Sequence, residues 1–391
     1  MAQAAKFCPQ IGILLALNLV VALACAAQKP KLPRQRILEK EIPLSRDRST
    51  GELRTSPSAE SETGLPTGVP VIRSRVALVE VQCTVTAPDG TRVRGLTRDD
   101  FRVREDGTEQ KVSSFDAAST SASIALIIDA SPSIYRELGT MRGVAQSLAT
   151  SLKPEDEVAV VAFAAETHLL LPFSRDRNLL LAALTSPDLA QVANSSQSFI
   201  YQAAYLSAAG LFKDRQGRKA ILLLTDGQDS GLGLTWNAAS MVPSAGANSP
   251  LAFQDVARGI AERGIELYVI STEPRPRAMT DAWLSAHREE TLVTDASRSA
   301  GIPSYTLYLA ELAREVGGEL YFLREVGSLA EIYRTIALKL EAEYTLGYYP
   351  AAGVATPGWR KLRLELRPDA QAPANSQLTY RTAYYVPASA R

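Results

Sequence analysis

The feature that most constrains the fold is a series of short apolar runs that alternate with helix-length stretches between residues 119 and 343. The first run, Ile124 to Ile128, is apolar at every position. A strand with this pattern is buried on both faces, as in a parallel sheet that helices cover on each side. The alternation therefore predicts an α/β domain with a doubly wound, mostly parallel sheet over residues 119–343.

The same patterning gives approximate positions for the other elements of this domain. Two long polar stretches interrupt the rhythm, at residues 229–250 and 274–303, and each follows a strand. We expect both to project from one end of the sheet, because loops of this length inside a compact domain are usually functional or disordered. Further strands are expected at residues 157–163, 168–171, 220–224, 266–270 and 319–323, and helices at about 135–152, 176–184, 200–212, 253–263, 307–316 and 329–343.

Segments typical of β-strands stand on both sides of the α/β region. Residues 71–118 contain three short runs with the turn signal Pro88-Asp89-Gly90, and residues 344–391 contain three more, separated by turn residues. Each flank is too small to form a sound core alone. We therefore expect the two flanks to pack into one small β-sandwich, with the α/β domain inserted between them.

The first 27 residues have the layout of an export signal. Lys6 precedes an uncharged apolar run over residues 11–24, and small residues follow. The run is shorter than the ~20 residues that a membrane-spanning helix needs. Two processing routes are open: ordinary cleavage after small residues, or a lipobox at Ala22-Leu23-Ala24-Cys25 in which Cys25 carries a lipid tether. In both cases we expect a location in the periplasm, the cell envelope or outside the cell.

Residues 28–70 separate this signal from the first β segment. The stretch is rich in charged residues, Ser, Thr and Pro, and it nearly lacks aromatic residues. Such a composition buries too little apolar surface to offset the loss of chain entropy on folding. We predict a flexible linker.

Charge and composition exclude several classes of function. Lys and Arg together number 42, as do Asp and Glu, so no global basic field exists to attract nucleic acid. The chain has 3 Cys and 2 His, and none of them has zinc-site spacing or stands beside a nucleophile motif. Cys83, on an expected strand, is interpreted as a packed apolar residue. We expect a protein that is not an enzyme.

Polar side chains gather where the predicted strands end. Asp129, Ser131 and Ser133 follow the first apolar strand, Asp226 follows a later one, and Ser198 lies in a polar loop that opens a helix. Ligands of doubly wound sheets bind at the carboxyl ends of the strands. Carboxylates and hydroxyls without sulfur or imidazole suit Mg²⁺, Mn²⁺ or Ca²⁺ and not zinc or copper. The sequence therefore predicts one divalent-cation site with an open coordination position.

These motifs resemble those of a known family. Asp-x-Ser-x-Ser after an apolar strand, a hydroxyl before a helix, and Thr-Asp-Gly after a later strand are similar to the metal-ion-dependent adhesion site of von Willebrand factor A (VWA) domains. The resemblance extends over about residues 72–386, to a VWA-related group of exported bacterial proteins of the acidobacterial type. The further matching motifs are Gly95-Leu96-Thr97 with Asp100-Phe101, Glu105-Asp106-Gly107, Asp156-Glu157-Val158, Asp229, Gly317-Gly318 and Tyr344-x-Leu346-Gly347-Tyr348.

The resemblance implies a role for each site residue. Asp129 would bind the cation directly or through water, Ser131 and Ser133 would be direct ligands, and Asp226 would act directly or through water. Ser198 stands where the family usually has Thr, and Ser195 or Ser196 could serve in its place. Pro132 replaces the usual Gly and stiffens the first loop.

The function that the resemblance implies is protein recognition. A partner's Glu or Asp would fill the open position of the cation, and the loops 229–250 and 274–303 would provide selectivity. Two alternatives remain: a scaffold of the cell envelope with a weak or vestigial metal site, and a metal-assisted hydrolase. The hydrolase lacks a convincing general base, because no His accompanies the loop and no carboxylate pair is spaced for two metals.

Overall fold

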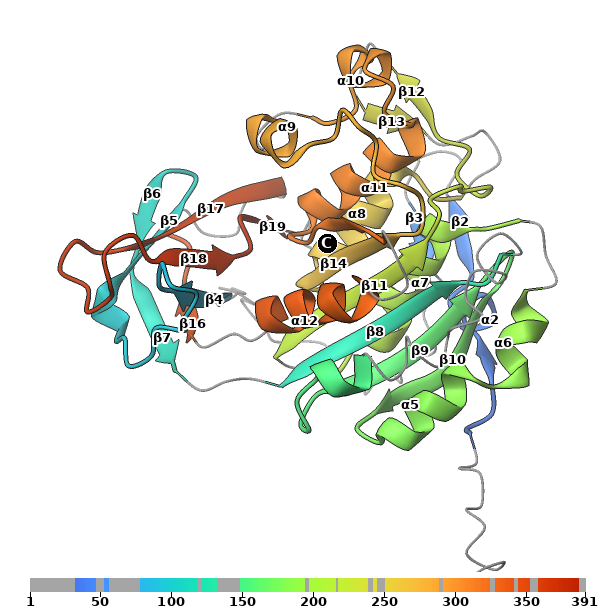
Figure 1. The fold of residues 1–391 in the computed structure, drawn as a ribbon, viewed down its shortest axis with the longest axis horizontal. Coiled ribbons are helices and arrows are strands. Elements are labelled where there is room, and N and C mark those ends of the chain that lie inside the picture. Colours follow the sequence, from blue (N-terminus) through green and yellow to red (C-terminus); the bar gives the residue numbers. More distant parts are fainter. Residues whose placement is uncertain are drawn as a thin grey trace, which may run out of the picture.

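The structure is a computed structural model, and Figure 1 shows an α/β domain beside a smaller all-β domain. The predicted export signal lies outside the described residues. Within the described part of the chain, no helix combines the length and the apolar character needed to cross a bilayer. The described residues are 32–46, 53–55, 78–117, 121–131, 148–193, 197–215, 217–237, 242–244, 250–287, 291–323, 328–340, 344–351 and 358–386.

The α/β domain is built on a seven-stranded sheet in the order β1-β10-β9-β8-β11-β14-β15. Strands β9, β8, β11, β14 and β15 pair in parallel. Strand β10 is antiparallel to both of its neighbours, β9 and β1. Every residue of the central strand β8 is buried, which confirms the doubly wound, mostly parallel sheet. The strands are β1 (Arg36–Ile37), β8 (Ala122–Asp129), β9 (Glu157–Phe163), β10 (Thr167–Ser174), β11 (Arg218–Thr225), β14 (Ile265–Ser271) and β15 (Leu320–Phe322).

Helices cover both faces of this sheet because side chains alternate along each buried strand. On β8, Ala125 and Ile127 join one core, and Ile124, Leu126 and Ile128 join the core on the other face. The first core contains α7 (Ile200–Leu211), α8 (Phe253–Ala261) and α11 (Ser304–Glu315). The second contains α5 (Arg177–Leu184), α6 (Pro187–Val192) and α12 (Ser328–Leu340).

Local sequence explains how these helices form. Helix α8 buries Phe253, Val256 and Ile260, whose spacing places them on one face, and the side chain of Asp255 caps its start by accepting from Ala252 N at 2.8 Å. The short helix α6 has no counterpart among the predicted elements, since six residues give too little periodicity to detect. Most of the helix expected at 135–152 lies outside the described residues.

The small β domain consists of two four-stranded sheets, with the orders β18-β4-β16-β7 and β19-β17-β5-β6. Each sheet combines strands from both flanks of the chain, and their inner faces share one apolar core. The predicted β-sandwich is confirmed. Its strands are β4 (Val79–Thr86), β5 (Phe101–Glu105), β6 (Thr108–Gln110), β7 (Val112–Asp116), β16 (Tyr344–Tyr348), β17 (Gly358–Leu366), β18 (Gln377–Tyr380) and β19 (Ala383–Val386).

Two buried tyrosines of β16 join the N-terminal and C-terminal halves of the sandwich. The Tyr344 hydroxyl donates to Val93 O at 2.8 Å, and the Tyr348 hydroxyl donates to a carboxylate oxygen of Glu105 at 2.6 Å. Cys83 is fully buried in the same core. These aromatic residues therefore belong to the core of the sandwich, as does the thiol.

The segment 28–70 departs from the prediction of a flexible linker. Strand β1 pairs with β10 and forms one edge of the seven-stranded sheet. The chain continues into helix α2 (Leu38–Glu41) and strand β2 (Leu44–Arg46), which pairs with β3 (Leu53–Thr55). Leu38 is only 1% exposed in the core beneath α7. The linker prediction is wrong for residues 36–46, which we call the strap. A few spaced apolar residues of this segment pack against the α/β domain, and the average composition of the segment does not reveal them.

Charge–charge and polar contacts also hold the strap. The Glu39 carboxylate accepts from Thr167 N at 2.9 Å and from Thr167 Oγ1 at 2.7 Å on β10. The guanidinium of Arg46 forms an ion pair with Asp255 of α8. The strap therefore contacts both the sheet edge and the helical layer of the α/β domain.

The two long polar stretches contain short elements of their own. These are the hairpin β12 (Thr235–Asn237) and β13 (Val242–Ser244), and the helices α9 (Asp281–Ala286) and α10 (Asp295–Ser299). Figure 1 shows all four grouped at the top of the α/β domain. Their grouping agrees with the expectation that both stretches project from one end.

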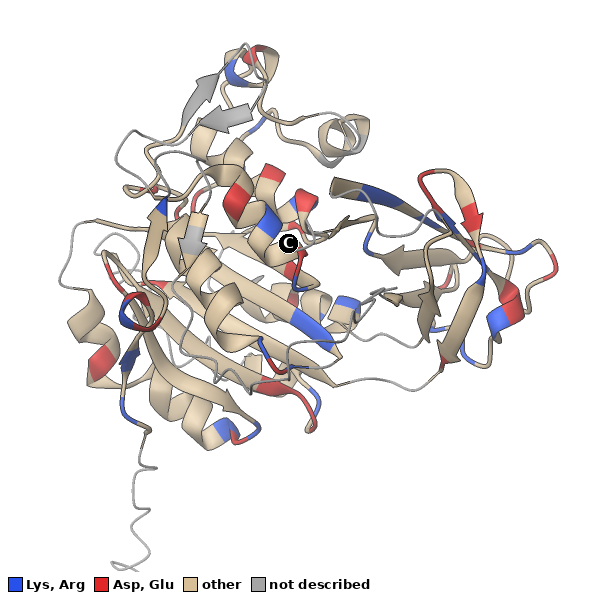
Figure 2. Ribbon diagram, turned by 180° about the vertical axis from the view of Figure 1, so that it is seen from behind, with Lys and Arg blue, Asp and Glu red and all other residues tan. Residues whose placement is uncertain are grey.

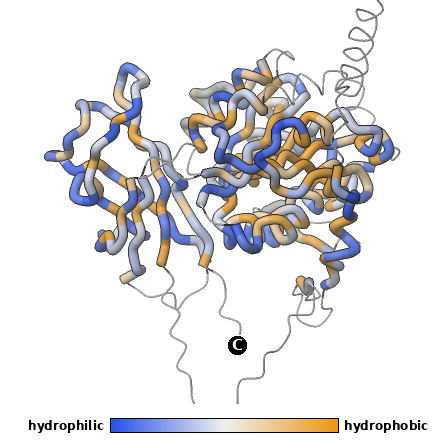
Figure 3. The backbone as a smooth tube through the Cα atoms, turned by 90° about the horizontal axis from the view of Figure 1, so that it is seen from below, coloured by the Kyte–Doolittle hydropathy of each residue, from blue (hydrophilic) through white to orange (hydrophobic). Residues whose placement is uncertain are grey.

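Charge and hydropathy follow the same architecture. Figure 2 shows residues of both signs intermixed over the two domains, in keeping with the zero net charge. Figure 3 shows apolar segments concentrated in the interior of the α/β domain. Folding of the larger domain is therefore driven mainly by burial of the sheet between its two helical layers.

Candidate metal centre

The polar residues predicted to form a site meet at one edge of the central sheet. Asp129 is the last residue of β8, and Thr225 is the last residue of β11, the neighbouring parallel strand. Asp226 follows β11 directly, and Ser198 lies two residues before α7. Parallel neighbours end at the same edge, so the topology brings distant parts of the sequence together.

Both carboxylate oxygens of Asp129 accept hydrogen bonds. Oδ2 accepts from Ser198 Oγ at 3.0 Å and from Thr225 Oγ1 at 2.7 Å. Oδ1 accepts from the backbone N–H of Ser131 at 3.0 Å. The orientation of Asp129 is thus fixed by three different segments of the chain.

Burial makes the charge of Asp129 costly. Its side chain has no exposed surface, and this burial raises the pKa of the Asp129 carboxyl, as does the negative charge of Asp226 to a smaller extent. The hydrogen bonds from Ser131 and Thr225 oppose the rise. A cation beside the two carboxylates would remove the repulsion and favour the ionised form of Asp129.

A tight turn presents Asp226 at the same edge. Asp226 is 6% exposed, and its Oδ1 accepts from Gln228 N at 2.9 Å. Gly227 has φ +91°, and a Cβ there would lie 3.0 Å from the ring of Tyr305, so both backbone and packing favour glycine. The Gly227 N–H donates to Thr225 Oγ1 at 3.0 Å, which leaves the hydroxyl proton of Thr225 for Asp129.

Asp229 positions the loop that holds Ser198. Its carboxylate accepts from Ile200 N at 2.8 Å at the start of α7 and from Leu232 N at 2.6 Å. The backbone of Ser230 donates to Ser198 O at 2.7 Å, which ties the two loops together. Burial raises the pKa of the Asp229 carboxyl. Asp229 therefore orients the loop that carries Ser198.

The structure places four of the five predicted ligands, namely Asp129, Ser131, Ser198 and Asp226, and all four are buried. Ser133 lies outside the described residues, as do Pro132, Ser195 and Ser196. The geometry brings the Ser198 hydroxyl against Asp129, and Ser131 contacts Asp129 through its backbone N–H and through its side chain. Whether these groups hold a cation stays a prediction.

Thr225 was not among the predicted site residues, although its hydroxyl donates to Asp129 Oδ2 at 2.7 Å. The signal was present, because Thr225 precedes Asp226-Gly227 and is the last residue of an apolar strand. Within the described ranges, no three His, Cys, Asp or Glu side chains cluster in a way that could hold a metal. The donor set is instead two carboxylates with hydroxyls, which fits a hard cation that keeps several waters.

The sequence itself was compared with known families. Residues 124–228 match the family model described as von Willebrand factor type A domain. The chain contains a VWA domain. The matched segment begins in β8 and ends just beyond Asp226, so it includes all of the residues that meet at the candidate site. No curated protein matches the sequence.

Solved structures with a similar arrangement share little sequence with this chain. An aerotolerance-related membrane protein from Bacteroides fragilis is 16% identical, covers 56% of this chain and 99% of its own, and has a TM-score of 0.38. BatB from Bacteroides thetaiotaomicron is 19% identical, with 56% and 98% covered and a TM-score of 0.36. A von Willebrand factor type A protein from Catenulispora acidiphila is 13% identical, with 79% and 72% covered and a TM-score of 0.38.

Proposed function

We propose that this chain is an exported VWA-type binding module that recognises a protein ligand through one divalent cation. Asp129, Ser131, Ser133, Ser198 and Asp226 would hold Mg²⁺, or Mn²⁺ or Ca²⁺ in its place. The observation that carries the proposal is the buried Asp129 carboxylate, whose Oδ2 accepts hydrogen bonds from two hydroxyls at the sheet edge. Asp129 also lies close enough to Asp226 for the charges of the two carboxylates to interact.

The chemistry of the donor set supports a cation. In the absence of a cation, two carboxylates must share a buried edge, which costs free energy. Mg²⁺ typically keeps several waters and takes only one or two carboxylates from the protein. When bound, the cation would supply a Lewis-acidic position that an Asp or Glu of a partner could fill. The loop elements β12, β13, α9 and α10 would then contact the rest of the partner.

Export is proposed from the sequence of residues 1–27 alone. Cleavage after the small residues would release the protein, whereas modification of Cys25 would tether it through a lipid. Mass spectrometry of the mature N-terminus distinguishes the two, because a lipid adds a large apolar mass to Cys25.

The positions of both histidines favour binding over a histidine-dependent hydrolase. His168 contacts Gln35 at 2.7 Å and Glu166 at 3.6 Å, and the His287 ring stacks on Trp283 at 4.3 Å. Neither contact includes a residue of the candidate metal centre. A scaffold role with a vestigial metal site remains the second candidate, and metal affinity separates it from the binding module.

The test is a calorimetric titration of the mature protein with Mg²⁺, repeated with Mn²⁺ and Ca²⁺. We expect one site per chain, weakened strongly in Asp129→Asn and Asp226→Asn and less in Ser198→Ala. Ser207→Ala is a matched control, because Ser207 is a buried serine of α7 whose hydroxyl has no partner within the described residues. Absence of both heat and a shift in melting temperature with all three cations would overturn the metal site.

Partner recognition is tested separately. Wild-type protein and Asp226→Asn are used as baits for proteins of the native cell envelope, each with Mg²⁺ and with a chelator. We expect a partner that only the wild type retains, and only with Mg²⁺. Retention that does not change with chelator or with the variant would favour the scaffold role.

A further inference from the structure

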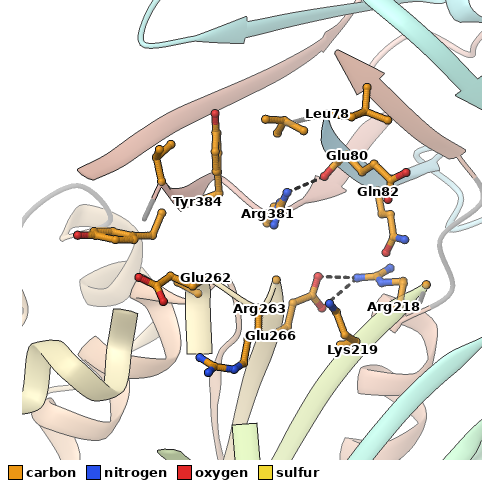
Figure 4. Close-up of a pocket in the computed structure, with 16 residues that line it drawn as sticks. Leu78, Glu80, Gln82, Arg218, Lys219, Glu262, Arg263, Glu266, Arg381 and Tyr384 are labelled. Atoms are coloured by element: carbon orange, nitrogen blue, oxygen red, sulfur yellow. Dashed lines mark hydrogen bonds and ion pairs between the residues drawn. The ribbon is translucent and has the colours of Figure 1, made fainter. Parts of the chain in front are cut away.

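A cavity of about 390 Å³ lies at the junction of the VWA domain and the β-sandwich (Figure 4). Its walls include the first residues of β11 and β14, the end of α8, and strands β4 and β19. The candidate metal centre lies at the other end of β11, about 20 Å away at ~3.3 Å per residue. The cavity is therefore separate from that centre and belongs to both domains.

The VWA side of the cavity presents a lysine that forms no ion pair among the described residues. Arg218 is paired with Glu266 at 2.8 Å and donates to Lys339 O at 2.5 Å. The adjacent Lys219 is only partly exposed, and it has no hydrogen bond or ion pair within the described part of the chain. Glu266 has little capacity left to pair with Lys219, because its carboxylate already accepts hydrogen bonds from Arg218 and from the Tyr268 hydroxyl, each at 2.8 Å.

The sandwich side presents an arginine that forms no ion pair among the described residues, although the charges of Glu266 and Glu80 partly oppose the lowering of its pKa by burial. Arg381, between β18 and β19, donates to the backbone oxygen of Glu80 at 2.6 Å, and its guanidinium lies 5.6 Å from the ring centre of Tyr384. Figure 4 shows Arg381 and Lys219 on opposite sides of the cavity. Lys219 and Arg381 thus belong to different domains and line the same cavity.

Positively charged side chains therefore lie close together in this cavity. Burial lowers the pKa of the Lys219 ammonium, and Arg381 and Arg263 lower it further, while Glu80 opposes them. Arg263, a fourth cation of the lining, donates to Gly259 O at 2.6 Å. Three carboxylates also belong to the lining: Glu266, which is paired with Arg218, and the exposed Glu80 and Glu262.

We propose that this junction cavity binds a small anion with at least two charged oxygens, a carboxylate or a phosphate, which bridges Lys219 of the VWA domain and Arg381 of the sandwich. The volume is in the range of small-molecule sites. A guanidinium and an ammonium offer several N–H donors to such an anion. Because the two cations belong to different domains, the bound anion would also fix the domains relative to each other.

The test uses the mature full chain at constant ionic strength, without divalent cations, and titrates inorganic phosphate and succinate separately by calorimetry and thermal unfolding. We expect one of the two to bind and to raise the melting temperature. Lys219→Gln and Arg381→Gln should each weaken that binding tenfold or more, which corresponds to about 1.4 kcal/mol. Lys111→Gln and Arg363→Gln are controls, because both side chains are exposed on the sandwich.

The outcomes separate the ligand classes and the two proposals. Binding of phosphate alone assigns a phosphate ligand, and binding of succinate alone assigns a carboxylate ligand. No binding of either up to about 10 mM, or equal binding in Lys219→Gln, would overturn the proposal. Arg381→Lys keeps the charge and guards against loss of folding in Arg381→Gln. Asp226→Asn should leave anion binding unchanged, so failure of the metal-site proposal can be distinguished from failure of the anion-site proposal.

Discussion

The hydroxyl of Thr225 donates a 2.7 Å hydrogen bond to Oδ2 of Asp129, which joins the ends of two adjacent parallel strands. The same hydroxyl accepts from the Gly227 N–H at 3.0 Å, so its proton is directed at the carboxylate. Thr225 therefore links the turn that presents Asp226 to the charge of Asp129.

Thr225→Val preserves the shape of the side chain and removes this link. We expect the variant to lose about 1–2 kcal/mol of unfolding free energy, because a buried acceptor and a buried N–H lose a partner. Mg²⁺ affinity should fall as Asp129 becomes less well oriented. Urea denaturation and calorimetry measure the two effects, and Thr345→Val, on strand β16 of the sandwich, is the control for affinity. Unchanged affinity in Thr225→Val would show that the hydroxyl does not support the site.

Glu315, at the end of α11, should make stability depend on pH. Burial raises the pKa of its carboxyl from 4.5 to about 7, and Glu311 contributes to the rise. Because the native state prefers the protonated form, this stabilisation is complete below about pH 4.5 and is lost as the pH rises through 7. Glu315→Gln should therefore be more stable than wild type by about 1–3 kcal/mol at pH 8, and similar to it at pH 4.5. Urea denaturation at several pH values measures the difference.

The control for this pH dependence is Glu331→Gln, on an exposed position of α12. It should leave the wild-type pH profile unchanged. If Glu315→Gln loses stability by the same amount as wild type between pH 5 and pH 8, another group is responsible.

The strap should contribute to the stability of the VWA domain. Leu38→Ala removes a side chain that is 1% exposed in the core beneath α7, and we expect a loss of about 2–4 kcal/mol. Hydrogen exchange of β10 should also accelerate, because β1 covers part of that edge. Lys40→Ala changes an exposed residue of the same helix and should have little effect. Equal stability of Leu38→Ala and wild type would show that the strap is not docked in solution.

The sandwich should depend on contacts between its two flanks. Tyr348→Phe removes the 2.6 Å hydrogen bond to Glu105, a carboxylate that is 4% exposed and also accepts from Tyr384 at 2.9 Å. We expect a loss of about 1–3 kcal/mol, since a buried charge loses one of its donors. Tyr349→Phe is the matched control, because Tyr349 is 50% exposed. Limited proteolysis of residues 78–116 should be faster in Tyr348→Phe only, and equal rates would contradict the prediction.

Much of the fold follows from the sequence because burial leaves a direct pattern in it. The run Ile124 to Ile128 can be stable only between two apolar layers, and strand–helix alternation then dictates a parallel sheet. Asp129 and Asp226 could be placed at one edge for the same reason, since parallel strands end together. The pairing of the two β flanks followed from their small size.

Other features depended on contacts between residues far apart in the chain. The strap has the composition of a linker, and only the exposed edge of β10 and the surface of α7 give Leu38 a place to be buried. Thr225 gained its role from the register of β11 against β8. Lys219 and Arg381 belong to different domains, and they line one cavity only where the two domains meet. Hydrophobic periodicity is local and is written in the sequence, whereas the proximity of two polar groups is set by the tertiary structure.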